Sequence, residues 1–121
     1  MAGTDDALAP LLRAVDGARD EVANLLADLV RYPTVNFGDG HPGHGGVPNG
    51  NETPCAEFLR DWLRREGLVA DVHESAPTRG SVIARLPGRG RQRTAPLSDP
   101  SLLLMSHLDV VPVEDPEAWP H

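Results

Sequence analysis

Apolar residues recur every three or four positions in the first quarter of the chain, which is the period of an amphipathic helix. Charged residues such as Arg19 and Asp28 fall between them, and Pro33 follows the last of them. We therefore expect one helix that ends before Pro33. Its apolar stripe consists of Val15, Ala18, Val22, Leu25, Leu26 and Leu29.

A second helix is predicted after a polar stretch. Residues 37–51 are rich in glycine and poor in apolar side chains, as is typical of a surface loop. Thr53 is then a candidate N-cap with Pro54 at the first helical position, and Gly67 is a candidate end. The inward face of this helix would carry Cys55, Phe58, Leu59, Trp62 and Leu63.

The second half of the chain contains three predicted strands. Residues 68–74 alternate weakly, residues 81–86 form a second run, and residues 89–100 are irregular and polar. Residues 102–105 are all apolar, which favours a strand that is buried on both faces. We expect an α/β fold, a partial three-layer sheet in which 102–105 is an interior strand and both helices pack against the sheet. Because these elements are few, we also expect an exposed apolar patch or an open sheet edge.

Composition narrows the class of protein. The chain has 121 residues, enough for one domain, and its net charge of −7 argues against a nucleic-acid partner. Its N-terminus lacks a basic stretch followed by an apolar one, and no apolar run approaches the length of a membrane span. We therefore expect a cytoplasmic protein that does not bind membranes. The single cysteine, Cys55, excludes an internal disulfide, and a buried side chain is favoured over a catalytic thiol.

Two polar residues with the spacing of a metal site follow the apolar run. In open α/β sheets, ligands bind beyond the carboxyl ends of the strands, where His107 and Asp109 are placed. Residues two apart in an extended segment project to the same side, so the Asp109 carboxylate is expected near the His107 ring. One ring nitrogen would then bind a metal ion while the other donates to the carboxylate. The alternative interpretation is a strand end that carries an ordinary surface histidine.

The segment around this pair closely resembles the first metal-site motif of a family of co-catalytic zinc hydrolases. Residues 102–113 read Leu-Leu-Leu-Met-Ser-His-Leu-Asp-Val-Val-Pro-Val, and Asp-Pro-Glu-Ala-Trp follows at 115–119. The family includes glutamate carboxypeptidase (carboxypeptidase G), acetylornithine deacetylase, succinyl-diaminopimelate desuccinylase and aminoacylase. Residues 29–36, 51–59 and 81–88 are similar to its turn after the first helix, its next helix and its next strand. The resemblance therefore covers nearly the whole chain.

This resemblance implies a function and a role for each residue of the motif. In the family, the histidine binds one of two zinc ions and the aspartate two residues later holds that histidine in place, which assigns His107 as a metal ligand and Asp109 as its catalytic partner. The other ligands and the general-base glutamate normally come later, beyond residue 121. The implied activity is hydrolysis of an amide or peptide bond in a small N-acyl amino acid or peptide. The implied cofactor is zinc, with cobalt or manganese as substitutes.

The resemblance also implies a partial domain. Residues 1–121 would be the N-terminal part of a catalytic domain, without the smaller inserted domain through which such proteins usually form homodimers. The chain alone is then expected to bind zinc weakly and to be inactive, because a catalytic zinc ordinarily has three protein ligands. The rival hypothesis is a non-catalytic, metal-free α/β module that binds a partner, or an inactive fragment.

Other residues have the chemistry of ligands but weaker contexts. His41 and His44 form a His-x-x-His pair within a solvated loop, which disfavours a metal site. His73 is expected to be an ordinary strand histidine, the terminal His121 has no assigned role, and Trp119 is expected to pack. Solvated or loop-capping carboxylates are expected at Glu114, Asp115 and Glu117.

Overall fold

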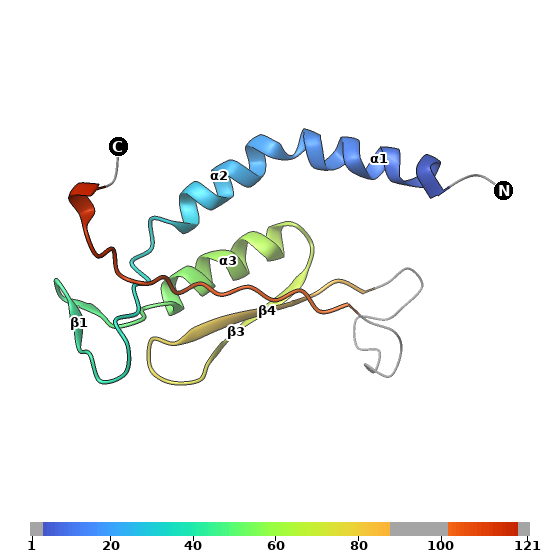
Figure 1. The fold of residues 1–121 in the computed structure, drawn as a ribbon. Helices are drawn as coiled ribbons and strands as arrows, with labels where there is room; N and C mark the ends of the chain where they lie inside the picture. Colours follow the sequence, from blue (N-terminus) through green and yellow to red (C-terminus); the bar gives the residue numbers. More distant parts are fainter. Residues whose placement is uncertain (1–3, 88–101, 119–121) are drawn as a thin grey trace. The chain divides into compact units, whose positions relative to one another are not determined.

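The structure, a computed structural model, describes the backbone of residues 4–87 and 102–118 (Figure 1). The chain divides into two compact units, residues 1–31 and residues 32–121, and each unit is described by itself. The irregular stretch predicted at 89–100 lies outside the described residues.

The first unit contains two consecutive helices instead of the single helix predicted. Helix α1 spans Thr4–Gly17 and helix α2 spans Arg19–Leu29, so the helical region ends where predicted. The break lies at Ala18, whose backbone has φ −88° and ψ 2°. Its N–H donates to both Ala14 O and Val15 O at 3.1 Å, as in the tightened last turn of a helix. No residue of α2 is buried, although its apolar stripe predicts a covered face.

The second unit is built on a helix that packs against a two-stranded sheet. Helix α3 spans Thr53–Arg65, strand β3 spans Val69–Glu74 and strand β4 spans Gly80–Arg85. The two strands are antiparallel neighbours joined by a short turn. These elements confirm the second predicted helix and the first two predicted strands, because the signals that specify them are local in the sequence.

The ends of α3 are determined by residues that lie close to it in sequence and in space. Its N-cap is Glu52 rather than the predicted Thr53, and the Thr53 N–H donates at 3.1 Å to Thr78 O in the turn between β3 and β4. At the other end, backbone bonds from Gly67 and Leu68 back to the helix form a Schellman motif. Gly67 has φ +84°, which favours glycine, so the predicted end of the helix is confirmed.

The buried core of this unit is small. Among the described residues, the buried apolar side chains are Cys55, Ala56 and Ala70, and the expected burial of Cys55 is thereby confirmed. The remaining members of the predicted inward face of α3 are half-buried: Phe58, Leu59, Trp62 and Leu63.

The glycine-rich region forms a short hairpin within the predicted loop. Strand β1 (Gly43–His44) pairs antiparallel with β2 (Val47–Pro48). The connecting residues Gly45 and Gly46 have φ +60° and +82°, which fits a two-residue turn that requires positive φ at both positions. The prediction of a surface loop is therefore correct in location but missed this hairpin.

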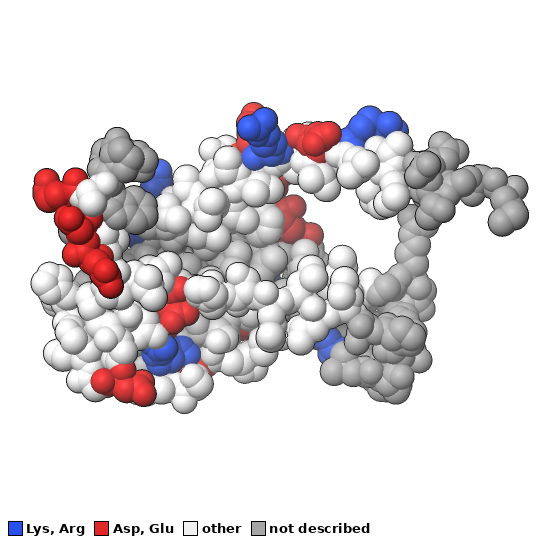
Figure 2. All heavy atoms as spheres, viewed as in Figure 1, with Lys and Arg blue, Asp and Glu red and all other residues white. Residues whose placement is uncertain are grey.

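The apolar run 102–105 corrects the predicted architecture. These residues are extended but unpaired, and their side chains are 84%, 79%, 83% and 87% exposed, so the predicted interior strand is wrong. In the view of Figure 1 this segment runs as an extended trace through the second unit, and the surface at the same place in Figure 2 is largely uncharged. No described strand pairs with it, and the described sheets have two strands each. The α/β class holds, the three-layer sheet does not form among the described residues, and the predicted exposed apolar patch is confirmed.

Within residues 4–87 and 102–118, each helix is too short or too polar to cross a bilayer.

Candidate functional site

The candidate site is held by a short parallel pairing between two distant segments. The Val110 N–H donates to Thr34 O at 3.1 Å, and the Asn36 N–H donates to Val110 O at 2.8 Å. The buried Thr34 adds a third bond, because its hydroxyl donates to Leu108 O at 2.8 Å. Residues 34–36 therefore fix the backbone at 108–110, from which the predicted metal-site residues project.

The His107 ring lies against Asp109, as the spacing of the two residues predicts. Its Nδ1 is 2.6 Å from the Asp109 backbone oxygen and 3.2 Å from the carboxylate Oδ1. Both partners are acceptors, so Nδ1 of the neutral ring must carry the proton and Nε2 must carry the lone pair. The His107 side chain is 81% exposed, which leaves Nε2 open to a ligand.

Asn36 holds the second oxygen of the same carboxylate. Its Nδ2 donates to Asp109 Oδ2 at 2.9 Å, and its own Oδ1 accepts the Gly38 N–H at 3.0 Å. The hydrogen bond from Asn36 lowers the pKa of the Asp109 carboxyl, and the bond with His107 adds to this effect. Asp109 is therefore a carboxylate that is fixed at both oxygens. Sequence reasoning did not assign Asn36 to the site, because its partner is 73 residues away.

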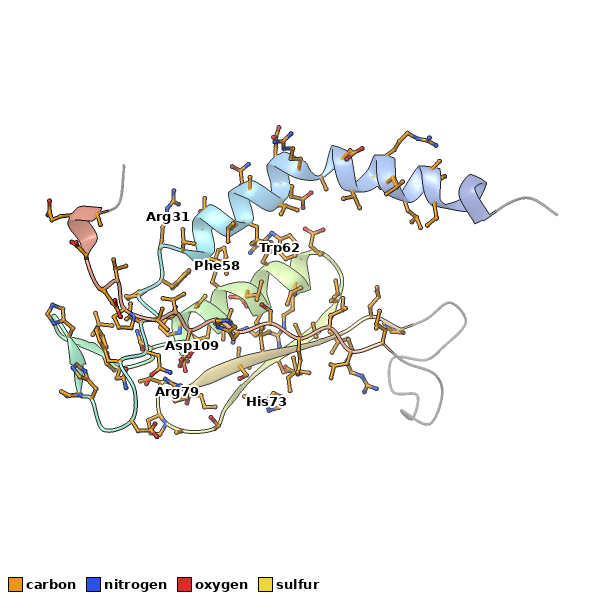
Figure 3. All side chains as sticks on the ribbon, in the orientation of Figure 1. Arg31, Phe58, Trp62, His73, Arg79 and Asp109 are labelled. Carbon is orange, nitrogen blue, oxygen red and sulfur yellow. The ribbon has the colours of Figure 1, made fainter. Side chains whose placement is uncertain are left out.

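An ion pair between a buried carboxylate and a partly exposed guanidinium lies near these residues. Arg79 Nη1 donates to Glu52 Oε1 at 3.0 Å, and the Glu52 side chain is 8% exposed. Its other oxygen, Oε2, is buried without a hydrogen-bond partner among the described residues. Burial raises the pKa of the Glu52 carboxyl; Arg79 lowers it, and the negative charge of Asp109 raises it. In Figure 3, Arg79 and Asp109 lie at the same end of the second unit, whereas His73 lies farther along the hairpin. Sequence reasoning missed Glu52 and Arg79, since no local pattern marks a buried ion pair.

The raised pKa of Glu52 predicts a pH-dependent contribution to stability. The folded protein binds this proton more tightly than the unfolded chain, in which the pKa is near 4.5. The stabilisation is therefore fully present below pH 4.5 and is lost as the pH rises through the folded pKa. In Glu52→Gln this dependence should disappear. The free energy of unfolding of the wild type should therefore increase relative to that of the variant as the pH falls. Urea unfolding of both proteins between neutral pH and pH 4.5 measures the difference.

The exposed Glu57 provides the matched control for that experiment, because Glu57→Gln removes a carboxylate from the same helix without touching the ion pair. Parallel pH profiles for wild type and Glu52→Gln would contradict the assignment.

The other predicted candidates do not join the site. The Phe37 ring stacks on His41 at 4.6 Å and lies 6.3 Å from His44. His41 Nδ1 accepts the Gly43 N–H at 3.1 Å, which places the proton of the neutral ring on Nε2. A metal ion at Nε2 would require this proton to move to Nδ1, and the bond from Gly43 would then be lost. His73 is an exposed residue of β3, as expected. Burial raises the pKa of the Cys55 thiol, which opposes a nucleophilic role.

The acidic residues after the motif serve a local turn. Asp115 Oδ1 accepts the Glu117 N–H at 3.2 Å at the start of a short 3₁₀ helix, Pro116–Ala118, so Asp115 is the loop-capping carboxylate expected here. Glu114 and Glu117 are exposed. Trp119 and His121 lie outside the described residues. Within the described chain, no group of three or more histidine, cysteine or acidic side chains is placed to hold a metal ion.

An apolar pocket lies next to the hairpin rather than at the histidine. Its volume is about 180 Å³, and it is lined by Pro33, Val35, Phe37, His44, Val47 and Pro48. Side chains alternate along an extended segment, so Val35 and Phe37 project away from the side on which Asn36 meets Asp109. The pocket is therefore not part of the His107–Asp109 site.

The chain is 29% identical over 109 residues to an N-formyl-4-amino-5-aminomethyl-2-methylpyrimidine deformylase from Halalkalibacterium halodurans. The match includes 90% of this chain, and the chain spans only 22% of the length of that relative. No family model matches the chain. No solved structure matches it either.

Proposed function

We propose that this chain carries the first metal-ligand motif of a zinc-dependent hydrolase that cleaves an amide bond. The observation that supports this proposal is the geometry at His107. Two acceptor oxygens of Asp109 contact Nδ1, and the exposed ring leaves Nε2 open to a ligand. A histidine that ligates a metal ion ordinarily makes such a bond through its other nitrogen, to a carboxylate or a backbone carbonyl. The similarity to a deformylase supports amide chemistry, because a deformylase removes a formyl group.

The residues present fit one ligand position and its support. His107 would bind the metal ion through Nε2, while Asp109 and Asn36 hold the ring in the required tautomer. When bound, zinc supplies an activated water and polarises the carbonyl of the substrate. The missing ligands and the general base are proposed to follow residue 121, as the resemblance to co-catalytic zinc hydrolases implies.

The substrate class follows from the same resemblance and from the relative. We propose a small N-acyl or N-formyl amide as the substrate, with N-acyl amino acids and short peptides as the wider class. A cytoplasmic location and a homodimer of the complete protein belong to the same proposal.

Two versions of the protein test this function. Residues 1–121, and the polypeptide obtained by extending them along the reading frame, are assayed against N-formyl aminomethylpyrimidine, N-acyl amino acids and dipeptides, with added zinc and with a chelator. The extended polypeptide should hydrolyse at least one of them and lose activity in the chelator, whereas residues 1–121 should be inactive. Metal-independent turnover, or zinc-dependent turnover by residues 1–121 alone, would contradict the proposal. Inactivity of both, with tight binding of a protein partner to the 102–105 run, would favour the metal-free module.

A further inference from the structure

A buried carboxylate, that of Glu52, lies near the His107–Asp109 pair, and one of its oxygens has no hydrogen-bond partner among the described residues. The whole Glu52 residue is 6% exposed. Arg79 bonds to its Oε1, and its Oε2 has no partner among the described residues. Burying a carboxylate costs several kcal/mol unless both its charge and its hydrogen bonds are compensated. Glu52 is also the N-cap residue of α3, yet its side chain does not cap the helix. Capping therefore does not explain why an acid is present at this position.

The two members of the ion pair differ in their access to solvent. The Arg79 side chain is 35% exposed and that of Glu52 is 8% exposed. Water and salt screen an exposed charge more strongly than a buried one. The field that this pair produces inside the unit is therefore dominated by the carboxylate. The negative charge of Asp109 raises the pKa of the Glu52 carboxyl, so the two carboxylates act on each other through space.

The backbone ties Glu52 to the segment that holds Asp109. The Glu52 N–H donates to Gly50 O, and the Gly50 N–H donates to Val35 O, each at 2.9 Å. Val35 is the residue that pairs with Val110 in the parallel bridge. Gly50 also leaves space for the ion pair, since a Cβ there would lie 1.5 Å from Arg79 Nη1 and 3.0 Å from Glu52 Oε1. The ion pair and the His107–Asp109 segment are thus connected through three residues.

We propose that Glu52 is a positioning residue for His107, whose buried carboxylate acts through Asp109 to keep the imidazole proton on Nδ1 and to leave Nε2 free for a ligand. Moving that proton to Nε2 would carry positive charge away from the nitrogen that faces Asp109, and a second carboxylate within reach makes this move less favourable. The inference deepens the proposed function and rests on His107 acting through Nε2. Its measurement needs neither metal nor substrate.

The test is the tautomer ratio of His107 in the full 121-residue chain, measured from the ¹⁵N shifts of the imidazole ring. The measurement is made at about pH 8.5, roughly two units above the histidine pKa of model peptides. The wild type should be mainly the Nδ1–H form. In Glu52→Gln, which keeps an acceptor for Arg79 and removes the charge, the ratio of the Nδ1–H to the Nε2–H form should fall about two- to threefold.

Two further variants separate this charge effect from a structural one. Glu74 is an exposed acid that accepts a hydrogen bond from the Thr53 hydroxyl, so Glu74→Gln removes a neighbouring carboxylate and should leave the ratio unchanged. Arg79→Gln keeps a donor for Glu52 and removes the counter-charge, and it should raise the ratio. Backbone amide spectra establish that each variant is folded.

Several results would overturn the proposal. An unchanged ratio in folded Glu52→Gln, an equal fall in Glu74→Gln, or a mainly Nε2–H wild type would each do so. If Glu52→Gln does not fold, Arg79→Gln decides, because a fall or no change in its ratio contradicts the proposed field. Zinc-dependent hydrolysis together with an unchanged ratio would overturn the role of Glu52 alone, and a shifted ratio without hydrolysis would overturn the proposed function alone.

Discussion

His107→Ala, made in the polypeptide that extends this sequence, is expected to lower zinc-dependent amide hydrolysis by at least about 100-fold. Replacing a residue that only supports a metal ligand typically costs 10- to 100-fold, and loss of the ligand itself should cost more. The variant also removes the group whose Nε2 is free in the structure. Steady-state rates at saturating zinc, together with the zinc content of the purified protein, measure the effect.

His73→Ala is the matched control for that experiment. His73 lies exposed on β3 and belongs to the same unit as His107, so its removal tests the general cost of losing a histidine. Its activity and zinc content should equal those of the wild type. If His107→Ala kept both as well, the assignment of His107 as a ligand would be wrong.

Gly50→Ala is expected to destabilise the second unit by about 2–4 kcal/mol, through backbone strain and displacement of a buried charge. Gly50 has φ +60°, which is unfavourable for alanine. The new methyl group would also stand 1.5 Å from Arg79 Nη1, so the guanidinium, the far end of a flexible side chain, must shift from its place beside Glu52. Although the arginine side chain can move, its departure leaves the buried carboxylate unpaired. Urea unfolding followed by circular dichroism measures the loss.

Gly45→Ala separates the two causes. Gly45 has the same φ of +60°, but a Cβ built on it meets nothing within 4 Å. This variant should therefore show the strain alone, about 1 kcal/mol. If both variants lost the same free energy of unfolding, displacement of Arg79 would cost nothing. The ion pair would then not contribute to the stability of the fold.

The elements predicted correctly are those with a local signal. Pro54 at the start of α3, Gly67 after its end and the short runs of β3 and β4 can each be recognised from a few neighbouring residues. The run 102–105 was predicted wrongly, because apolar character specifies a buried strand only where other elements cover it. Here no described strand pairs with the run, and its side chains are exposed. Ala18 divides the first helical region although the apolar period continues through it.

The candidate site shows the same division between local and distant information. The contact between His107 and Asp109 follows from a spacing of two residues, and the structure confirms it. Asn36 and Glu52 reach this pair from segments that are more than 50 positions away, and a single sequence does not show which distant residues meet. Their contributions could be found only once the pairing of residues 34–36 with 108–110 was known.

The burial of Cys55 gives the protein an internal reporter of opening. Its side chain is 2% exposed in α3, and it is the only thiol in the chain. A thiol reagent can reach it only when the helix separates from its surroundings, so the rate of alkylation counts these openings without any introduced label. Because every molecule carries one such group, mass spectrometry can follow the modified fraction in a mixture of variants. The natural sequence is therefore already suited to pooled measurements of local stability.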